Sequence, residues 1–145
     1  MGSHGDLSRC NYNHTVKSTM NSSVDQTMIL VVEDDIAIGA LLCMSLEDEG
    51  YQVRVVSDGA LALRTIQETH PALVLLDFQL PSLNGDQIIA RMQTSETLRT
   101  IPVIVLSAYR ILPEPIHAHA YAILRKPFDL THLRELVSGL ISPSA

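Results

Sequence analysis

From residue 28 onward, short runs of apolar residues alternate with segments in which apolar residues recur every three or four positions. Each run is apolar throughout, as in strands that are covered on both sides and have no polar face. The segments between the runs have the spacing of one face of a helix. The pattern therefore predicts a parallel sheet with helices on both faces. Its strands are expected over 28–32, 51–56, 72–76, 102–106 and 121–124.

The segment after the fourth predicted strand differs from the other connecting segments. It contains Pro113 and Pro115, and proline fits only the first turn of a helix. The last segment, by contrast, carries a long helical pattern that starts after Asp129, a residue type that caps helices. We therefore expect the fourth helix to be short, displaced or absent and the fifth to be regular.

Charged and polar residues stand where the predicted strands end. Glu33 and Asp34 follow the first strand, Asp77 closes the third, Ser107 closes the fourth, and Lys126 follows the fifth. In doubly wound sheets the ligand binds beyond the carboxyl ends of the strands, so all five residues fall at the edge that holds the site. Clustered acids repel one another and need a cation, for which a hard divalent ion is the natural candidate.

Five short motifs in this order make the chain resemble response regulator receiver domains over 28–141. The motifs are Ile29-Leu30-Val31-Val32-Glu33-Asp34-Asp35, Leu73-Val74-Leu75-Leu76-Asp77, Pro81 with Gly85, Val103-Ile104-Val105-Leu106-Ser107-Ala108, and Lys126-Pro127-Phe128. The resemblance implies a flavodoxin-like, doubly wound, five-stranded parallel sheet of order 2-1-3-4-5 with helices on both faces. It also implies a cis peptide bond before Pro127.

The resemblance further implies a role for each residue at the strand ends. Asp77 would accept a phosphoryl group from a phosphohistidine, and Lys126 and Ser107 would bind phosphoryl oxygens. The implied cofactor is Mg²⁺, held by Asp34 and Asp77 directly.

Two further ligands of the implied Mg²⁺ come from neighbouring positions. Glu33 would contribute through water and Gln79 through its backbone carbonyl. Mg²⁺ commonly keeps several waters and uses one or two carboxylates, which suits so sparse a set. The chain would then be a phosphoacceptor, not an enzyme with a separate substrate, although it would catalyse its own phosphorylation and dephosphorylation.

Some of these residues also have simpler explanations. Asp34 and Asp35 could cap the helix that follows, and we assign that role mainly to Asp35. Ser107 could be an ordinary strand-end hydroxyl and Lys126 an ordinary surface lysine. Asp77 has no such alternative, because an acid that closes a buried run is costly.

The chain departs from the family pattern around its last strand. The family usually has an aromatic residue three positions before the lysine, where this chain has Ile123; Tyr121 lies two positions earlier. The conventional readout is therefore expected to be altered. Gln79 and Tyr109 stand at positions that flank the phosphoryl group in this family, and the bulk of Tyr109 is expected to slow its hydrolysis.

Three other functions compete with this interpretation. A receiver-like scaffold would bind partners without regulated phosphorylation, but it would not need the acids, Ser107 and Lys126. A phosphatase of the haloacid dehalogenase type needs a second acid where Gln79 stands. An FMN carrier of the flavodoxin type needs a phosphate loop where Glu33, Asp34 and Asp35 would repel the phosphate.

Composition sets the remaining expectations. Residues 1–27 are polar without a sustained period and are expected to be a disordered tail, 28–141 a receiver domain, and 142–145 a stub. With no effector domain expected, the chain is interpreted as a stand-alone receiver. Its partners would be a sensor histidine kinase or a histidine phosphotransfer protein, and a downstream protein target.

Charge and cysteine content bear on partners and compartment. The net charge of −6 disfavours direct contact with nucleic acid or an anionic membrane. Cys10 and Cys43 are expected to be free thiols, since two cysteines make no disulfide framework. Together with the absence of an apolar signal sequence, this predicts a cytoplasmic protein.

Overall fold

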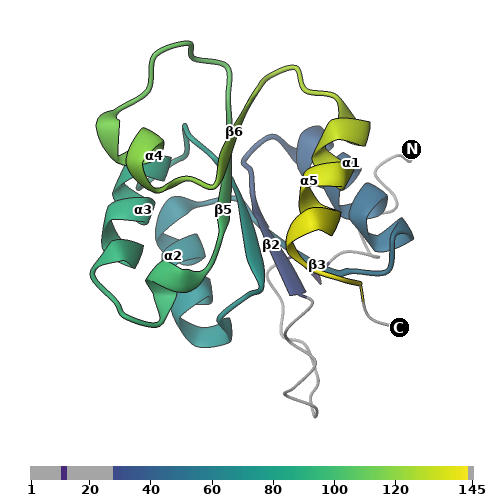
Figure 1. Ribbon diagram of the computed structural model, residues 1–145, viewed down its shortest axis with the longest axis horizontal. Coiled ribbons are helices and arrows are strands. Elements are labelled where there is room, and N and C mark those ends of the chain that lie inside the picture. The colour runs from purple at the N-terminus through teal and green to yellow at the C-terminus, as the bar shows by residue number, and fades with distance from the viewer. Residues whose placement is uncertain (1–10, 13–27, 144–145) are drawn as a thin grey trace.

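The computed structural model describes residues 11–12 and 28–143 of the chain, and it forms a sheet with helices on both faces (Figure 1). The strands are β1 (Asn11–Tyr12), β2 (Met28–Val32), β3 (Gln52–Val56), β4 (Leu73–Asp77), β5 (Val103–Ser107) and β6 (Ala122–Arg125). The helices are α1 (Ile36–Asp48), α2 (Gly59–Thr69), α3 (Gly85–Gln93), the 3₁₀ turn η3 (Leu98–Thr100), α4 (Glu114–His119) and α5 (Leu130–Leu140).

The strand order is β1-β3-β2-β4-β5-β6, and every pairing is parallel. Apart from the two-residue β1, this is the predicted five-stranded sheet of order 2-1-3-4-5, with each predicted strand found within one residue of its expected position. The strand β1, which pairs with β3 at the sheet edge, was not predicted. The rest of the predicted tail lies outside the described residues.

Two apolar layers hold the sheet between its helices. One layer joins a face of the sheet to α2, α3 and α4, and it includes Leu30, Ile66 and Ile88. The other joins the opposite face to α1 and α5, and it includes Leu42 and Leu133. Figure 1 shows the two sets of helices on either side of the strands. Burial on both faces explains why β2, β4 and β5 are apolar almost throughout.

The fourth helix is short, as the two prolines predict. α4 has only six residues, begins after Pro113 and carries Pro115 in its first turn. The regular last helix is also confirmed, because Asp129 caps α5 by accepting the Thr131 N–H at 2.9 Å. The Lys126–Pro127 peptide bond is cis, as the family resemblance implies.

One expectation about the cysteines is wrong. Cys43 is fully buried in α1 and is disulfide-bonded, whereas the prediction for Cys10 falls outside the described residues. Spacing along the chain could not reveal this bond, because it depends on which segments the fold brings together. The cysteines therefore give no support to a reducing compartment. Within the described part of the chain, no helix has the length and apolar character to span a membrane.

Candidate functional site

Four neighbouring strands end at the same edge of the sheet, and each delivers a polar residue there. The register pairs Val32 with Leu76, Asp77 with Leu106, and Ser107 with Arg125. Glu33, Asp77, Ser107 and Lys126 therefore lie side by side across the ends of β2, β4, β5 and β6. They line one pocket of about 460 Å³ together with Asp34. The structure brings together all five residues that the strand ends predict.

Three carboxylates converge in this pocket. One oxygen each of Glu33, Asp34 and Asp77 lies within 4.8 Å of the others. Glu33 and Asp77 are buried, with exposed fractions of 2% and 6%, whereas Asp34 is exposed. Buried acids this close need a cation, and oxygen donors without sulfur or imidazole suit a hard ion such as Mg²⁺. The residues present therefore fit the implied magnesium ion.

Gln79 lies on the loop that follows β4 and lines the same pocket. This placement agrees with the predicted use of its backbone carbonyl as a metal ligand. The ligand role itself stays a prediction.

Lys126 is the cation that faces the acids. Its Nζ lies 3.1 Å from Glu33 Oε1 and 3.4 Å from Asp77 Oδ1. Burial alone would lower the pKa of Lys126, but the Glu33 and Asp77 carboxylates together raise it above the usual value for lysine. Its backbone N–H also donates to the Ser107 carbonyl at 2.8 Å, which fixes the end of β6 against β5. Lys126 is thus held in the site and is not an ordinary surface lysine.

The two buried acids of the pocket, Glu33 and Asp77, have raised pKa values. Burial, and next the nearby Asp77 charge, raise the pKa of Glu33 to about 7, although Lys126 opposes the shift. Burial likewise raises the pKa of Asp77, against the lowering effects of Lys126, Glu33 and the Gln79 backbone N–H. One lysine therefore does not fully compensate these buried acids. This imbalance favours the binding of additional positive charge in the pocket.

Asp35 has the capping role assigned to it. Its side chain accepts the Ile38 N–H at 3.1 Å at the start of α1. Its own N–H donates to Glu33 Oε2 at 3.2 Å, so the cap also steadies the buried acid. Asp34 makes no capping bond in the described structure and belongs to the carboxylate group instead.

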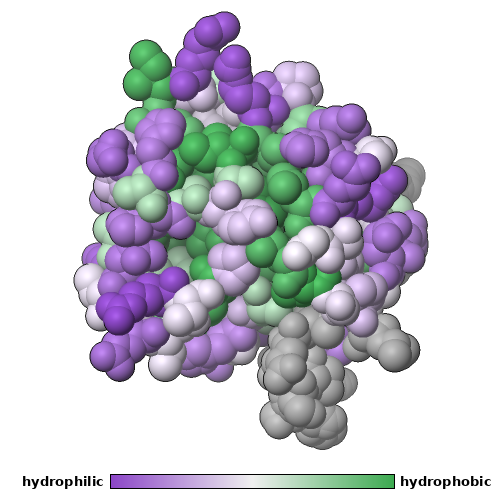
Figure 2. Space-filling model, in the orientation of Figure 1, coloured by the Kyte–Doolittle hydropathy of each residue, from purple (hydrophilic) through white to green (hydrophobic). Residues whose placement is uncertain are grey.

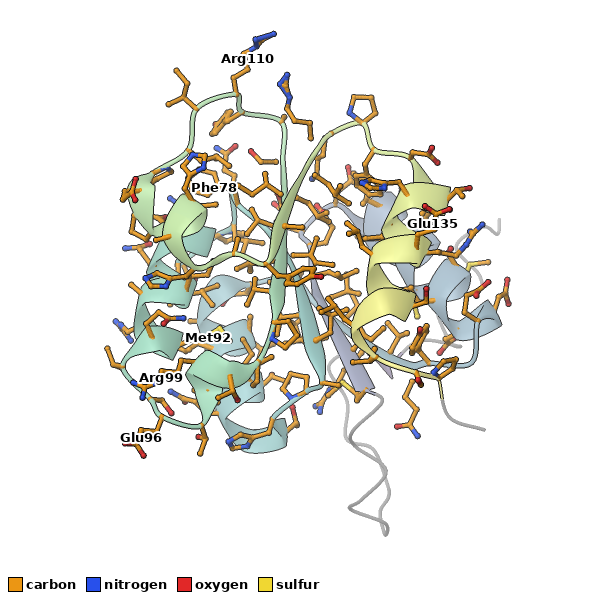
Figure 3. All side chains as sticks on the ribbon, viewed as in Figure 1. Phe78, Met92, Glu96, Arg99, Arg110 and Glu135 are labelled. Atoms are coloured by element: carbon orange, nitrogen blue, oxygen red, sulfur yellow. The ribbon has the colours of Figure 1, made fainter. Side chains whose placement is uncertain are left out.

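Two side chains meet across the mouth of the pocket. The Tyr109 hydroxyl donates to Gln79 Oε1 at 2.8 Å, joining the loops after β5 and β4. The Tyr109 ring also meets the edge of Phe78, with ring centroids 5.7 Å apart. In Figure 3, Arg110 projects outward from the loop after β5, and Phe78 lies below it, within the outline of the molecule.

Ser107 also bonds to the backbone of Tyr109 and so helps to hold this bridge in place. Its buried Oγ accepts the Tyr109 N–H at 2.9 Å. The family resemblance predicts that Gln79 and Tyr109 lie beside the site, but it does not predict the hydrogen bond between them. A contact between two loops 30 residues apart leaves no spacing signal in the chain.

The fold and the site together define a doubly wound α/β protein with a carboxylate-rich cation site and a facing lysine. The response regulator receiver domain family matches residues 29–138. The chain therefore belongs to this family.

Individual relatives give the same result. Sporulation initiation phosphotransferase F of Bacillus subtilis is 34% identical over 112 residues, which cover 75% of this chain and 89% of that protein. The transcriptional regulatory protein PrrA of Mycobacterium leprae is 34% identical over 125 residues, 84% of this chain and 53% of that protein. The chain thus spans about half the length of several regulators that it matches.

A solved structure also resembles the chain closely. The receiver domain of the sensor histidine kinase PA1611 from Pseudomonas aeruginosa PAO1 superposes with a TM-score of 0.72 at 27% identity, covering 79% of this chain and 96% of that one. That crystal structure has a magnesium ion coordinated in the active site cleft.

Proposed function

We propose that the chain is a phosphoacceptor that takes a phosphoryl group from a phosphohistidine onto Asp77. The observation that carries the proposal is the position of the Asp77 carboxylate. It is buried at a strand end, beside two other acids and 3.4 Å from the Lys126 ammonium. Such an arrangement costs free energy in the resting protein and becomes favourable when a cation and an anionic phosphoryl group arrive.

Each residue has a separate part in the transfer. An Asp77 oxygen attacks phosphorus, the P–O bond forms as the P–N bond of the phosphohistidine breaks, and the released imidazole takes a proton from solvent. Lys126 then shifts part of its charge from the acids to a phosphoryl oxygen. Ser107 donates its hydroxyl hydrogen to another phosphoryl oxygen.

Asp34 and Asp77 would hold Mg²⁺ directly, Glu33 through water, and Gln79 through its backbone carbonyl. The ion would neutralise the acids and draw charge from the phosphoryl oxygens. The observation that supports this set is the close approach of the three carboxylates. The chain then works as a signalling domain with no separate substrate to turn over.

The proposed partners follow from this chemistry. The donor would be a sensor histidine kinase or a histidine phosphotransfer protein, and the product would switch contacts with a downstream protein. Residues 28–141 form the domain that carries this activity. The scaffold alternative is weaker, because a scaffold gains nothing from acids whose burial raises their pKa values.

A small phosphorus–nitrogen donor tests the proposal without a partner. We would incubate wild type, Asp77→Asn and Asp86→Asn with phosphoramidate and Mg²⁺ and record intact masses. Asp86 lies in the first turn of α3, outside the pocket, and serves as the matched control. We expect one added phosphoryl group on wild type and on Asp86→Asn, and none on Asp77→Asn. Equal uptake by Asp77→Asn would place the acceptor elsewhere.

A further inference from the structure

The loop after the acceptor aspartate is held by the start of a neighbouring helix. We call residues 78–84, between β4 and α3, the acceptor loop. It carries Gln79, Leu80 and Pro81, all of which line the pocket. Its internal bonds are the Gly85 N–H to the Phe78 carbonyl at 2.7 Å, the Leu83 N–H to the Pro81 carbonyl at 2.8 Å and the Leu80 N–H to Asn84 Oδ1 at 3.3 Å. These bonds cannot fix the loop against the rest of the molecule, and the bonds to the Leu106 carbonyl and to Tyr109 hold only its first two residues.

Asp58 supplies an external attachment. Its Oδ1 accepts the Leu61 N–H at 3.0 Å and caps α2, while its Oδ2 accepts the Ser82 hydroxyl at 2.7 Å. One carboxylate thus joins the beginning of α2 to the middle of the acceptor loop. A hydrogen bond to an ionised carboxylate is stronger than one between neutral groups.

Gly59 makes a second attachment beside the first. Its N–H donates to the Pro81 carbonyl at 3.0 Å. A Cβ on Gly59 would lie 2.2 Å from the Leu83 carbonyl oxygen, so only glycine allows α2 to approach the loop backbone this closely. The acceptor loop therefore rests directly on α2.

Ser82 has a backbone conformation that needs such support. Its φ of 72° lies in the left-handed region, which non-glycine residues seldom adopt. Strained residues persist where surrounding contacts over-determine them. The bond from Ser82 to Asp58 is the side-chain contact that stabilises this conformation.

We propose that Asp58 and Ser82 are positioning residues for the phosphoacceptor site, and that their hydrogen bond holds the acceptor loop so that the Gln79 backbone faces the metal. The inference rests on the proposed function, because it assigns the loop its place in magnesium binding. Neither residue lines the pocket. Their effect passes through residues 78–81, the four residues between Asp77 and Ser82, all of which line the pocket.

A double-mutant cycle on magnesium affinity tests the inference. We would measure the Mg²⁺ dissociation constant by calorimetry for wild type, Ser82→Ala, Asp58→Ala and the double variant. Loss of this bond should weaken Mg²⁺ binding about threefold to tenfold, and the double variant should be no weaker than Asp58→Ala alone. Ser95→Ala is the control, since the Ser95 hydroxyl also makes a hydrogen bond, by accepting the Leu98 N–H at the start of η3, but lies outside the pocket. Its affinity should equal that of wild type.

A metal-free measurement gives an independent readout. Amide hydrogen exchange at Leu83 and Gly85 should be faster in Ser82→Ala than in wild type, with exchange in α5 unchanged. Wild-type Mg²⁺ affinity in both single variants, or unchanged exchange at these amides, would overturn the inference. Failure of the proposed function would look different: wild type would then take no phosphoryl group from phosphoramidate, while the exchange effect of Ser82→Ala would remain.

Discussion

The edge of the sheet that carries the pocket keeps the residue pattern of the family, whereas the region of α4 and β6 departs from it. At the pocket edge, the five residues that we assign to phosphoryl chemistry line one pocket, where Lys126 bonds Glu33 and lies beside Asp77. Along α4 and β6, the helix has six residues, and Ile123 stands where the family has an aromatic residue. Tyr121 is 56% exposed at the start of β6 and does not line the pocket.

Figure 2 shows hydrophobic residues gathered in the middle of the face that carries β6, with hydrophilic residues over the flanking helices. Ile123 packs against the apolar layer under α4. Its side chain has no polar group that could form a hydrogen bond with a residue of the pocket. We infer from this difference that the proposed reaction and its readout are separable. The proposed phosphoryl transfer would depend on a few fixed charges, whereas a readout surface could change without altering them.

The largest effect should come from removing the lysine of the pocket. Lys126→Met keeps the length of the side chain but removes the charge that meets the phosphoryl oxygens. We expect phosphorylation by acetyl phosphate to slow by roughly a hundredfold or more, the usual scale for losing one preorganised charge contact. Arg125→Met, an exposed cation one position away, should react at the wild-type rate. Equal rates for both variants would mean that Lys126 has no part in the transfer.

A pH-dependent loss of stability should come next. The pKa of Glu33 is about 7 in the folded protein, against 4.5 in the unfolded chain, because of burial first and Asp77 second. The folded state therefore keeps a proton that the unfolded chain releases, so the free energy of unfolding falls as pH rises through this window. In metal-free protein the fall should be on the order of 3 kcal/mol between about pH 4.5 and about pH 7.

Urea unfolding followed by circular dichroism across this range measures the effect. Glu33→Gln should lose most of this fall, because position 33 then has no proton to release; a smaller fall should remain, since burial also raises the pKa of Asp77. Glu96→Gln, at an exposed position away from the pocket, should keep the wild-type dependence. A wild-type stability that rises with pH would contradict the assignment.

The bridge across the pocket mouth should have a smaller effect on phosphoryl lifetime. Tyr109→Ala removes both the ring and the bond to Gln79, which opens the pocket to water. We expect the aspartyl phosphate to hydrolyse several-fold faster, with Tyr109→Phe between wild type and Tyr109→Ala; a factor of ten corresponds to about 1.4 kcal/mol in the barrier. Decay of the phosphorylated mass measures the lifetimes. Tyr121→Ala, away from the pocket, should match wild type, and an unchanged lifetime in Tyr109→Ala would refute the shielding role.

The readout region should leave the reaction almost unaffected. Ile123→Ala removes part of the packing under α4 and should cost about 1–2 kcal/mol of unfolding free energy, while the rate of phosphorylation stays within about twofold. Ile111→Ala, at a side chain that is 88% exposed, should change neither quantity. A large fall in the phosphorylation rate of Ile123→Ala would contradict the inference that the reaction is independent of the α4–β6 region.

The sequence predicted those parts of the molecule that depend on local pattern. Continuous apolar runs located the strands, and parallel order then placed Glu33, Asp77 and Lys126 at one edge. The prolines correctly predicted a short α4. The bonds from Tyr109 to Gln79 and from Ser82 to Asp58 were not predictable, because they join loops whose approach only the complete fold determines.

The disulfide of Cys43 escaped prediction for a similar reason. A cysteine within a helical pattern looks like any small apolar core residue, and Cys43 is indeed fully buried. The residues around a cysteine do not show whether it is bonded. Local periodicity therefore predicts elements and sheet edges well, and side-chain contacts between separate segments poorly.

The most direct test of the central claim is the intact mass after incubation with acetyl phosphate, with and without Mg²⁺, for wild type and Asp77→Asn. We expect wild type to gain one phosphoryl group only when Mg²⁺ is present, and Asp77→Asn to gain none under either condition. If folded wild type gains no phosphoryl group in the presence of Mg²⁺, the chain is a binding module that works without phosphorylation, and the account is wrong.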